Sequence, residues 1–568
     1  MSSISRREFV GIATAGVAAA AARAGDSPAS SAPALRAKPG DNPIIERNTV
    51  ITLSVTAAGT YQDPYNDVDV DFIVTAPNGE QQVVPGYYDS GQTWSCNFCG
   101  TDVGTNVIKT RCSVASDSGL HGRPFTVDVK AYQGTNPLYG SGRLRSAADK
   151  HHLEHMDGTP FLWIGDTWWM GLCARLNDDN FAALLRDRAA KGFSLVQIIA
   201  GPYPDMDAWD PRGAGPSGFP FEQDFARVNA SYFADATRRI QAIVDAGLVP
   251  CIVGMWGYYL PQIGLDKVKR FWRNLVARFA AYPVVWCICG EATMPYYLSE
   301  KKEEDAAAQK AGWTEVMRYV REIDGYHNPI TIHPTQYGHE QVDDPSLMDV
   351  DMLQTGHSDI ETIPNVIKSV RTALAHEPKL PIVNGEVNYE GIMGRCWQNI
   401  IRLSFYHSML NGVSGFTYGA NGIWQVNEQG KPYGPSPHGR AWGNTPWDEA
   451  MNLPGSRQVG LGGKFFARFA WWELQRQPDW YDESKKENDA YGVVVAGIPR
   501  KLRIAYAPMC WNPPTIKAIE TDLQYSAYYF DPITGNEIAL GPIKPDENGN
   551  WTPPFPPEVH DWVIFLQA

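Results

Sequence analysis

Between residues 160 and 425 the chain alternates between short apolar runs and longer amphipathic runs. The amphipathic run 177–192 begins with Asn and Asp and ends with Gly, the usual signals for the start and end of a helix. Eight strands that alternate with helices predict a (β/α)8 TIM barrel, a fold of the α/β class. A doubly wound sheet is the alternative, but no Gly-rich dinucleotide motif follows the first strand. The expected strands lie within 161–169, 193–201, 248–256, 284–294, 328–335, 350–357, 380–390 and 414–425.

Segments on both sides of the barrel have a different pattern. From about residue 48 to 132, and again after about residue 476, short alternating runs are separated by turns rich in Gly, Pro, Asn and Asp. Such a pattern is typical of β-sandwiches. We therefore expect an N-terminal, immunoglobulin-like β-sandwich at 42–140, a catalytic barrel at 145–475 and a C-terminal β-sandwich at 479–568.

The first 24 residues have the pattern of a twin-arginine signal peptide. SRREFV at 5–10 precedes an apolar run at 10–22, and Ala22-Arg23-Ala24 offers a cleavage site. The apolar run is too short to cross a bilayer, which needs ~20 residues. Residues 25–41, rich in Ala, Ser and Pro, predict a linker. We expect the protein to be periplasmic or secreted.

Charge limits the possible partners. The net charge is −14, whereas nucleic acids and anionic membranes bind basic surfaces. No later segment is long and apolar enough for a membrane helix, so we expect neither a nucleic-acid partner nor membrane insertion. The 19 Trp and 26 Tyr suit both sugar binding and ordinary cores. No pattern indicates the oligomeric state.

The chain has nine cysteines, so at least one must be unpaired within the chain. Cys251, Cys287 and Cys289 lie in apolar runs and are expected to be core thiols. Two among Cys96, Cys99 and Cys112 could form a disulfide in an exported protein.

Two glutamates follow apolar strands in the same way. Glu291 comes after Gly290 at the end of the fourth strand, and Glu386 comes after Gly385 on the seventh. A carboxylate is costly to bury unless it is paired or used. In TIM barrels, catalytic residues lie at the C-terminal ends of strands, and strands four and seven face each other across the mouth. Paired carboxyls are the groups that glycoside hydrolysis requires, so both glutamates are predicted to be catalytic.

Other polar and aromatic residues follow the remaining strands and are expected to face the same mouth. We assign them to substrate binding, although each has a structural alternative: Asp166 could cap the next helix, His357 suits a supporting hydrogen-bond role, and each Trp suits the core equally well. The predicted binding residues are Asp166, Trp168, Trp256, His333, His357, Asn388, Tyr389, Tyr418 and Trp424.

Several motifs resemble those of one known family. LWIGDTWW, CGEATM, QTGH, NGEVNYEG and GFTYGANGIW look like the motifs of glycoside hydrolase family 140, a clan A type whose founding activity is on apiose in pectin. The resemblance covers the barrel, roughly 145–475, and the flanks are similar to the β-sandwich and collagen-binding-type modules that accompany it. It implies that Glu386 is the nucleophile of a retaining enzyme and Glu291 its acid/base. Gly290 departs from the Asn that precedes the acid/base in many clan A enzymes.

Three other functions remain open. The barrel could bind carbohydrate without catalysis, or the chain could be a structural or adhesive protein. A metal-dependent hydrolase would need a His/Asp cluster, which Asp166, His333 and His357 could supply. The sequence nevertheless favours a glycoside hydrolase with a carbohydrate substrate, no cofactor and no metal. Long loops after the second and eighth strands, at 201–223 and 426–450, are predicted to shape the substrate site.

Overall fold

The centre of the computed structural model is a sheet of eight parallel strands in the order β17-β16-β15-β14-β13-β20-β19-β18. The structure describes residues 35–568 except 483, 485 and 487, so the predicted signal peptide lies outside the described residues. The outer strands approach each other, since Asp349 N donates to Ile330 O at 2.8 Å, and the eight strands form a nearly closed barrel. The strands are β13 (Trp163–Trp168), β14 (Leu195–Ile199), β15 (Val249–Val253), β16 (Val285–Cys287), β17 (Ile330–Thr331), β18 (Asp351–Gln354), β19 (Ile382–Glu386) and β20 (Gly415–Tyr418).

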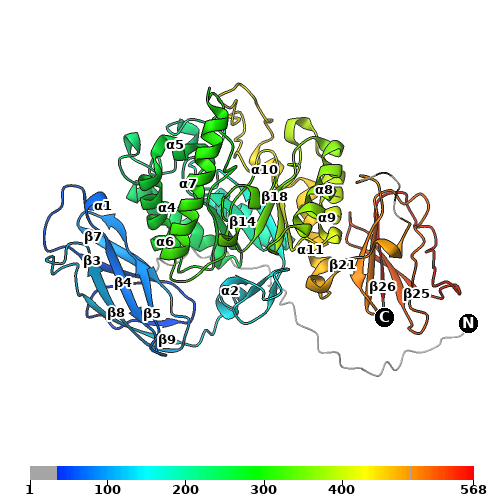
Figure 1. The fold of residues 1–568 in the computed structure, drawn as a ribbon, viewed down its shortest axis with the longest axis horizontal. Helices are drawn as coiled ribbons and strands as arrows, with labels where there is room; N and C mark the ends of the chain where they lie inside the picture. The colour runs from blue at the N-terminus through cyan, green and yellow to red at the C-terminus, as the bar shows by residue number, and fades with distance from the viewer. Residues whose placement is uncertain (1–34, 483, 485, 487) are drawn as a thin grey trace, which may run out of the picture.

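Helices surround the barrel, so that every residue of β14 and β15 is buried (Figure 1). The first of these helices has the predicted ends: the Asn177 side chain accepts from Asn180 N, and Gly192 closes the helix with φ of 94°. The helices of the barrel region are α3 (Asp178–Lys191), α4 (Ala230–Asp245), α5 (Leu260–Ile263), α6 (Leu265–Phe279), α7 (Lys302–Ile323), α8 (Ile363–Ala375), α9 (Gln398–Asn411), α10 (Trp447–Ala450) and α11 (Pro454–Phe466).

Two sheets precede the barrel and lie against α6, at the left of Figure 1. One has the order β1-β3-β7-β6 and the other β2-β9-β8-β4-β5. Strand β1 falls inside the predicted linker. The elements are β1 (Arg36–Ala37), β2 (Ile44–Glu46), β3 (Ile51–Thr56), α1 (Pro64–Asp67), β4 (Val70–Thr75), β5 (Gln81–Pro85), β6 (Tyr87–Ser90), β7 (Thr93–Phe98), β8 (Gly104–Cys112) and β9 (Pro124–Lys130). The connection to the barrel contains α2 (Pro137–Gly140), β10 (Leu144–Ser146), β11 (Leu153–His155) and β12 (Pro160–Phe161).

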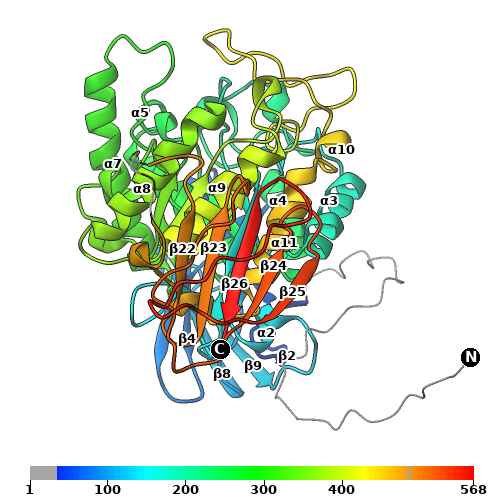
Figure 2. The same ribbon diagram turned by 90° about the vertical axis from the view of Figure 1, so that its right-hand side faces the viewer.

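The C-terminal segment forms one six-stranded sheet on the opposite side of the barrel, facing the viewer in Figure 2. The sequence pattern predicts a sandwich of two sheets here. One face of the sheet packs on barrel helices instead, as the contacts of Phe465 in α11 with Phe530 and Phe565 show. The strands are β21 (Gln475–Arg476), β22 (Val494–Ile498), β23 (Leu502–Ala507), β24 (Ser526–Phe530), β25 (Glu537–Pro542) and β26 (Trp562–Gln567).

All nine cysteines lie among the described residues, and all are buried free thiols. The disulfide considered among Cys96, Cys99 and Cys112 is therefore absent. Burial raises the pKa of Cys96 and of Cys99 above the ordinary thiol value, which keeps both in the neutral form. Within the described part of the chain, no helix combines the length and apolar character needed to cross a membrane.

Candidate active site

A cavity of about 250 Å³ lies at the C-terminal ends of the barrel strands. Its walls come from the residues that end or follow strands β13, β14, β15, β16, β18, β19 and β20, which is where barrel enzymes carry their active sites. Both predicted catalytic glutamates line it. The lining residues are Trp169, Pro204, Asp205, Trp256, Glu291, Met294, Tyr297, Gln354, His357, Glu386, Tyr389, Ile392, Trp424, His438, Arg440 and Trp442.

Glu386 ends β19 and is held between two histidines. Its Oε1 lies 2.8 Å from His357 Nε2, and its Oε2 lies 3.0 Å from His333 Nε2. The carboxyl is only 5% exposed, and burial by itself raises its pKa. The two imidazoles outweigh that effect and hold the pKa of Glu386 well below its usual range. Glu386 is therefore a carboxylate at neutral pH.

Glu291 follows β16 and has the opposite electrostatic environment. Burial raises its pKa to about 7, and the neighbouring Glu386 carboxylate adds to the shift. Trp256 Nε1 donates to Glu291 Oε2 at 3.3 Å. The backbone of Glu291 has φ of 40°, in the left-handed region that non-glycine residues rarely adopt. Strain of this kind is common where a side chain must be aimed into a site.

Gln354, the last residue of β18, joins the two carboxyls. Its Nε2 donates to Glu291 Oε1 at 3.1 Å and to Glu386 Oε1 at 3.0 Å. Because a single nitrogen bonds both oxygens, those two oxygens cannot lie more than about 6 Å apart. The two acids thus differ in protonation across a short gap.

Aromatic rings form much of the remaining wall. Of the predicted binding residues, Trp256, His357, Tyr389 and Trp424 line the cavity. Tyr389 lies 4.6 Å from the His357 ring and 5.9 Å from that of Trp424, measured between ring centroids. His333 does not line the cavity; it is fully buried behind Glu386.

Asp166 and Trp168 face away from the cavity, contrary to the prediction. Arg188 of α3 donates to Asp166 Oδ2 at 2.6 Å, and Trp168 Nε1 donates to the same oxygen at 2.7 Å. Successive side chains of a strand point to opposite faces. The pair in β13 therefore points outward to the helices, and Trp169 points into the mouth in place of Trp168.

Asn388 and Tyr418 are also buried outside the cavity. Asn388 Nδ2 donates to Asp359 O at 3.2 Å and so ties two loops together. Tyr418 donates to Glu390 Oε2 at 2.6 Å, in the layer between strands and helices. Both support the strand ends and are too enclosed to contact a ligand in the cavity.

The two long loops contribute residues that had not been singled out. Asp205, from the loop after β14, accepts from Tyr297 Oη and from Trp442 Nε1, both at 2.9 Å. His438 stacks on Tyr297 with ring centroids 4.7 Å apart. The sequence marked these loops as long and aromatic, but nothing in it pairs a given loop residue with another across the mouth.

The alternative metal site does not form. The Asp166 carboxylate bonds Arg188 and Trp168, so it does not join His333 and His357. Within the described ranges no three His, Cys, Asp or Glu side chains are grouped as metal ligands.

The described residues have relatives in structure at low sequence identity. A glycoside hydrolase is 19% identical with a TM-score of 0.63, covering 77% of this chain and 99% of its own. A family 5 glycoside hydrolase from Bacteroides vulgatus ATCC 8482 is 20% identical with a TM-score of 0.63, covering 77% and 95%. A further protein of that organism is 16% identical with a TM-score of 0.68, covering 93% and 100%. The fold is thus that of clan A-type glycoside hydrolases.

Sequence comparisons identify the barrel itself. Comparison with curated protein sequences finds no match for this chain. Residues 45–112 match a domain of unknown function, DUF5060. Residues 147–473, which contain every residue that lines the cavity, match the model "Apiosidase-like, catalytic domain". The chain belongs to the apiosidase-like family.

Proposed function

We propose that this protein is an exported, retaining glycoside hydrolase in which Glu386 is the nucleophile and Glu291 the acid/base. The observation that carries the proposal is the pair of carboxyls bridged by Gln354, one with a lowered and one with a raised pKa. A retaining mechanism needs one ionised carboxylate to attack and one protonated carboxyl to protonate the leaving oxygen.

The short gap between the carboxyls supports retention of configuration. The bridge through one amide nitrogen brings an oxygen of each carboxyl within about 6 Å of the other, which favours the closer pairing of a retaining enzyme over the wider, water-holding gap of an inverting one. The family description makes apiosides the first substrates to test. We expect a carbohydrate substrate in which the sugar ring packs against Trp256, Tyr389 or Trp424.

We further propose that residues 1–24 direct twin-arginine export and that 42–140 is an immunoglobulin-like β-sandwich. Twin-arginine substrates fold before they cross the membrane. Nine buried, free thiols fit a chain that folds in a reducing compartment, where disulfides are rare.

The test compares wild type, Glu291→Gln and Glu386→Gln on a panel of aryl glycosides that includes an apioside, with product anomers followed by NMR. General acid/base assistance is worth ~10²–10⁴-fold, so each variant should lose at least ~100-fold in kcat. Glu340→Gln, an exposed residue in the same barrel, is the matched control. Activity that survives in both variants would refute the assignment.

Azide separates the two roles. Added azide should restore cleavage of an activated substrate by Glu291→Ala, because it takes the glycosyl group from Glu386 in place of water and gives a glycosyl azide of retained configuration. The same reagent with Glu386→Ala should give the inverted azide. A protein that binds sugars but hydrolyses none of the panel would instead favour a non-catalytic carbohydrate-binding barrel.

A further inference from the structure

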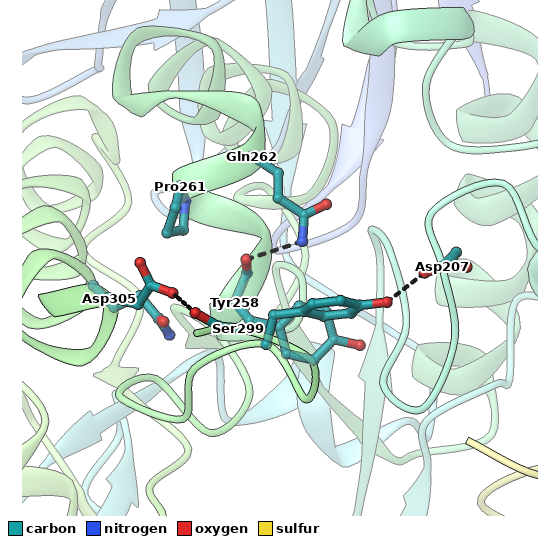
Figure 3. Close-up of a pocket in the computed structure, with 8 residues that line it drawn as sticks. Asp207, Tyr258, Pro261, Gln262, Ser299 and Asp305 are labelled. Carbon is teal, nitrogen blue, oxygen red and sulfur yellow. Dashed lines mark hydrogen bonds between the residues drawn. The ribbon is translucent and has the colours of Figure 1, made fainter. Parts of the chain in front are cut away.

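A second cavity, of about 330 Å³, lies beside the first. Figure 3 shows that polar groups from several loops and helices surround it. Tyr296 donates to Asp207 Oδ1 at 2.6 Å, and Ser299 Oγ donates to Asp305 Oδ2. The lining residues are Asp207, Tyr258, Pro261, Gln262, Tyr296, Ser299, Asp305 and Gln309.

Gln309 supplies evidence that this cavity receives a hydrogen-bond donor. Its side chain is fully buried, and its Nε2 donates to Ala292 O at 2.8 Å and to Met294 O at 2.9 Å. Because both partners are carbonyls, the amide orientation is settled. Its Oε1 accepts no hydrogen bond from the described residues. A buried acceptor without a partner costs about 1–3 kcal/mol, so a group that donates to it is favoured.

The two cavities share a wall of tyrosine rings. Tyr297 lines the first cavity, and its ring centroid lies 5.5 Å from that of Tyr258 and 6.0 Å from that of Tyr296, which both line the second. Gln309 also holds the loop that carries Glu291, through Ala292 and Met294. A ligand that reaches from the first cavity across Tyr297 would therefore enter the second.

We propose that the second cavity is a subsite for a neutral sugar residue, occupied by a distal unit of a substrate chain whose scissile bond lies at Glu291 and Glu386. The inference rests on the proposed function. Sugar hydroxyls donate to carboxylates and amide carbonyls, and sugar faces pack on aromatic rings. Asp207 and Asp305 accept such bonds and repel a uronic acid. The subsite thus selects chains that carry a neutral residue at this position.

The experiment measures binding and turnover separately. Asp207→Asn, Asp305→Asn and the double variant are compared with wild type by calorimetry, using neutral arabino- and galacto-oligosaccharides from disaccharide to hexasaccharide, and oligogalacturonides of equal length. Glu304→Gln is the matched control, because Glu304 is an exposed acid in the same first turn of α7 and does not line the cavity.

We expect wild type to bind a longer neutral chain more tightly than the disaccharide. Each variant should weaken that longer-chain binding by about tenfold, as expected for one lost charged hydrogen bond, and should lower the ratio of long-chain to short-chain kcat/KM by a similar factor. The control should change neither. Thermal unfolding of each variant verifies that it is folded.

Three outcomes would overturn the subsite. Affinity could be independent of chain length, the double variant could bind every chain as wild type does, or crystals soaked with the tightest ligand could hold only water beside Gln309. Loss of binding in the variants without any hydrolysis by wild type would refute the proposed function and leave the subsite standing. Hydrolysis by wild type, with binding unchanged in the variants, would support the proposed function and refute the subsite.

Discussion

At the scale of single residues, the site depends on two glutamates placed in opposite environments. Glu386 has two histidines and an amide as hydrogen-bonding or close neighbours, whereas Glu291 has an indole, an amide and the Glu386 charge. The difference in pKa follows from these neighbours and from burial. It assigns the proton to Glu291 before any substrate is present.

The pH profile of kcat/KM should therefore lose activity as pH rises through about 7, the pKa of Glu291 in the free enzyme, because the acid must be protonated to act. The loss should approach tenfold per pH unit above that value. In Glu386→Gln one negative charge is removed, so the Glu291 pKa should fall while burial still keeps it above the ordinary value. Carboxyl ¹³C NMR measures the pKa of Glu291 in wild type and in Glu386→Gln. A Glu291 pKa unchanged in that variant would contradict the coupling.

Asp166 should matter for stability rather than for substrate binding. Asp166→Ala removes one of the two carboxylate partners of the fully buried Arg188, which keeps its ion pair with Asp187. The lost charged hydrogen bond costs about 1.5–3 kcal/mol. Urea unfolding should show this loss, while KM of the folded fraction stays at the wild-type value. Asp235→Ala, which breaks an exposed ion pair with Arg238, is the comparison. A raised KM with wild-type stability would instead show that Asp166 contributes to substrate binding, as the sequence predicts.

Single residues also decide how much of the site the sequence predicts. The position of the two glutamates at the cavity is predictable because each follows a glycine at the end of an apolar strand. The sequence does not distinguish Trp168 from Trp169 as the cavity residue, because a run of two tryptophans does not show which one faces inward. That depends on the strand's side-chain alternation, and β13 begins at a residue that the sequence does not mark.

At the scale of elements, the ends of strands bring the site together. Gly290 has no side chain because the Trp256 indole occupies the position that a Cβ would take. Just beyond β15 and β16, the backbones of Trp256 and Gly290 pair in a parallel β-bridge. The chain's departure from the Asn common in clan A enzymes is thus a packing requirement. Its consequence is that Trp256 lies close enough to donate to Glu291.

Gly290→Ala should displace Trp256 and weaken its bond to Glu291. We expect kcat to fall by about 100-fold, the cost of misplacing a catalytic group by about 1 Å, with the fold retained. Tryptophan fluorescence and kcat measured together report the two effects. Gly264→Ala serves as a comparison: a Cβ there meets nothing, although its φ of 89° makes some loss of stability expected. Unchanged kcat in Gly290→Ala would show that the Trp256 contact is dispensable.

Loops set the limit of what periodicity can predict. The eight strands and their order follow from alternating apolar runs, since a parallel strand is buried on both faces. The bond of Trp442 to Asp205 joins residues more than two hundred positions apart on irregular loops. No local sequence pattern identifies such a partner. The sequence therefore predicts that the loops shape the substrate site, but it does not predict which residues they bring into contact.

At the scale of the whole molecule, the flanking sheets are fastened to the barrel by buried polar contacts. On the N-terminal side Asn97 Nδ2 donates to Arg278 O of α6 at 2.6 Å. The C-terminal sheet needs barrel helices as its second layer. Its strands β23 and β26 are buried along nearly their whole length, which from sequence alone resembles the core of a two-sheet sandwich. The covering layer comes from elsewhere in the chain.

On the C-terminal side, a buried ion pair joins α9 to Asp561, the residue before β26. Arg402 donates to both oxygens of Asp561 at 2.7 Å, Tyr506 donates to the same carboxylate at 2.9 Å, and both charged side chains are 7% exposed. The Tyr406 ring stacks on Tyr506 with centroids 4.5 Å apart. A bidentate pair with little water around it couples the two parts strongly.

Asp561→Ala should therefore destabilise the junction as well as the sheet. The unpaired Arg402 charge costs about 3–5 kcal/mol, and calorimetry should resolve one wild-type transition into two, with the C-terminal sheet melting first. Arg500→Gln, which breaks an ion pair of the same sheet with Asp522 on its exposed surface, should leave the melting profile as it is. Because neither Arg402 nor Asp561 lines the cavity, kcat below the first transition should match wild type. A single transition at a lower temperature would mean that sheet and barrel unfold as one unit.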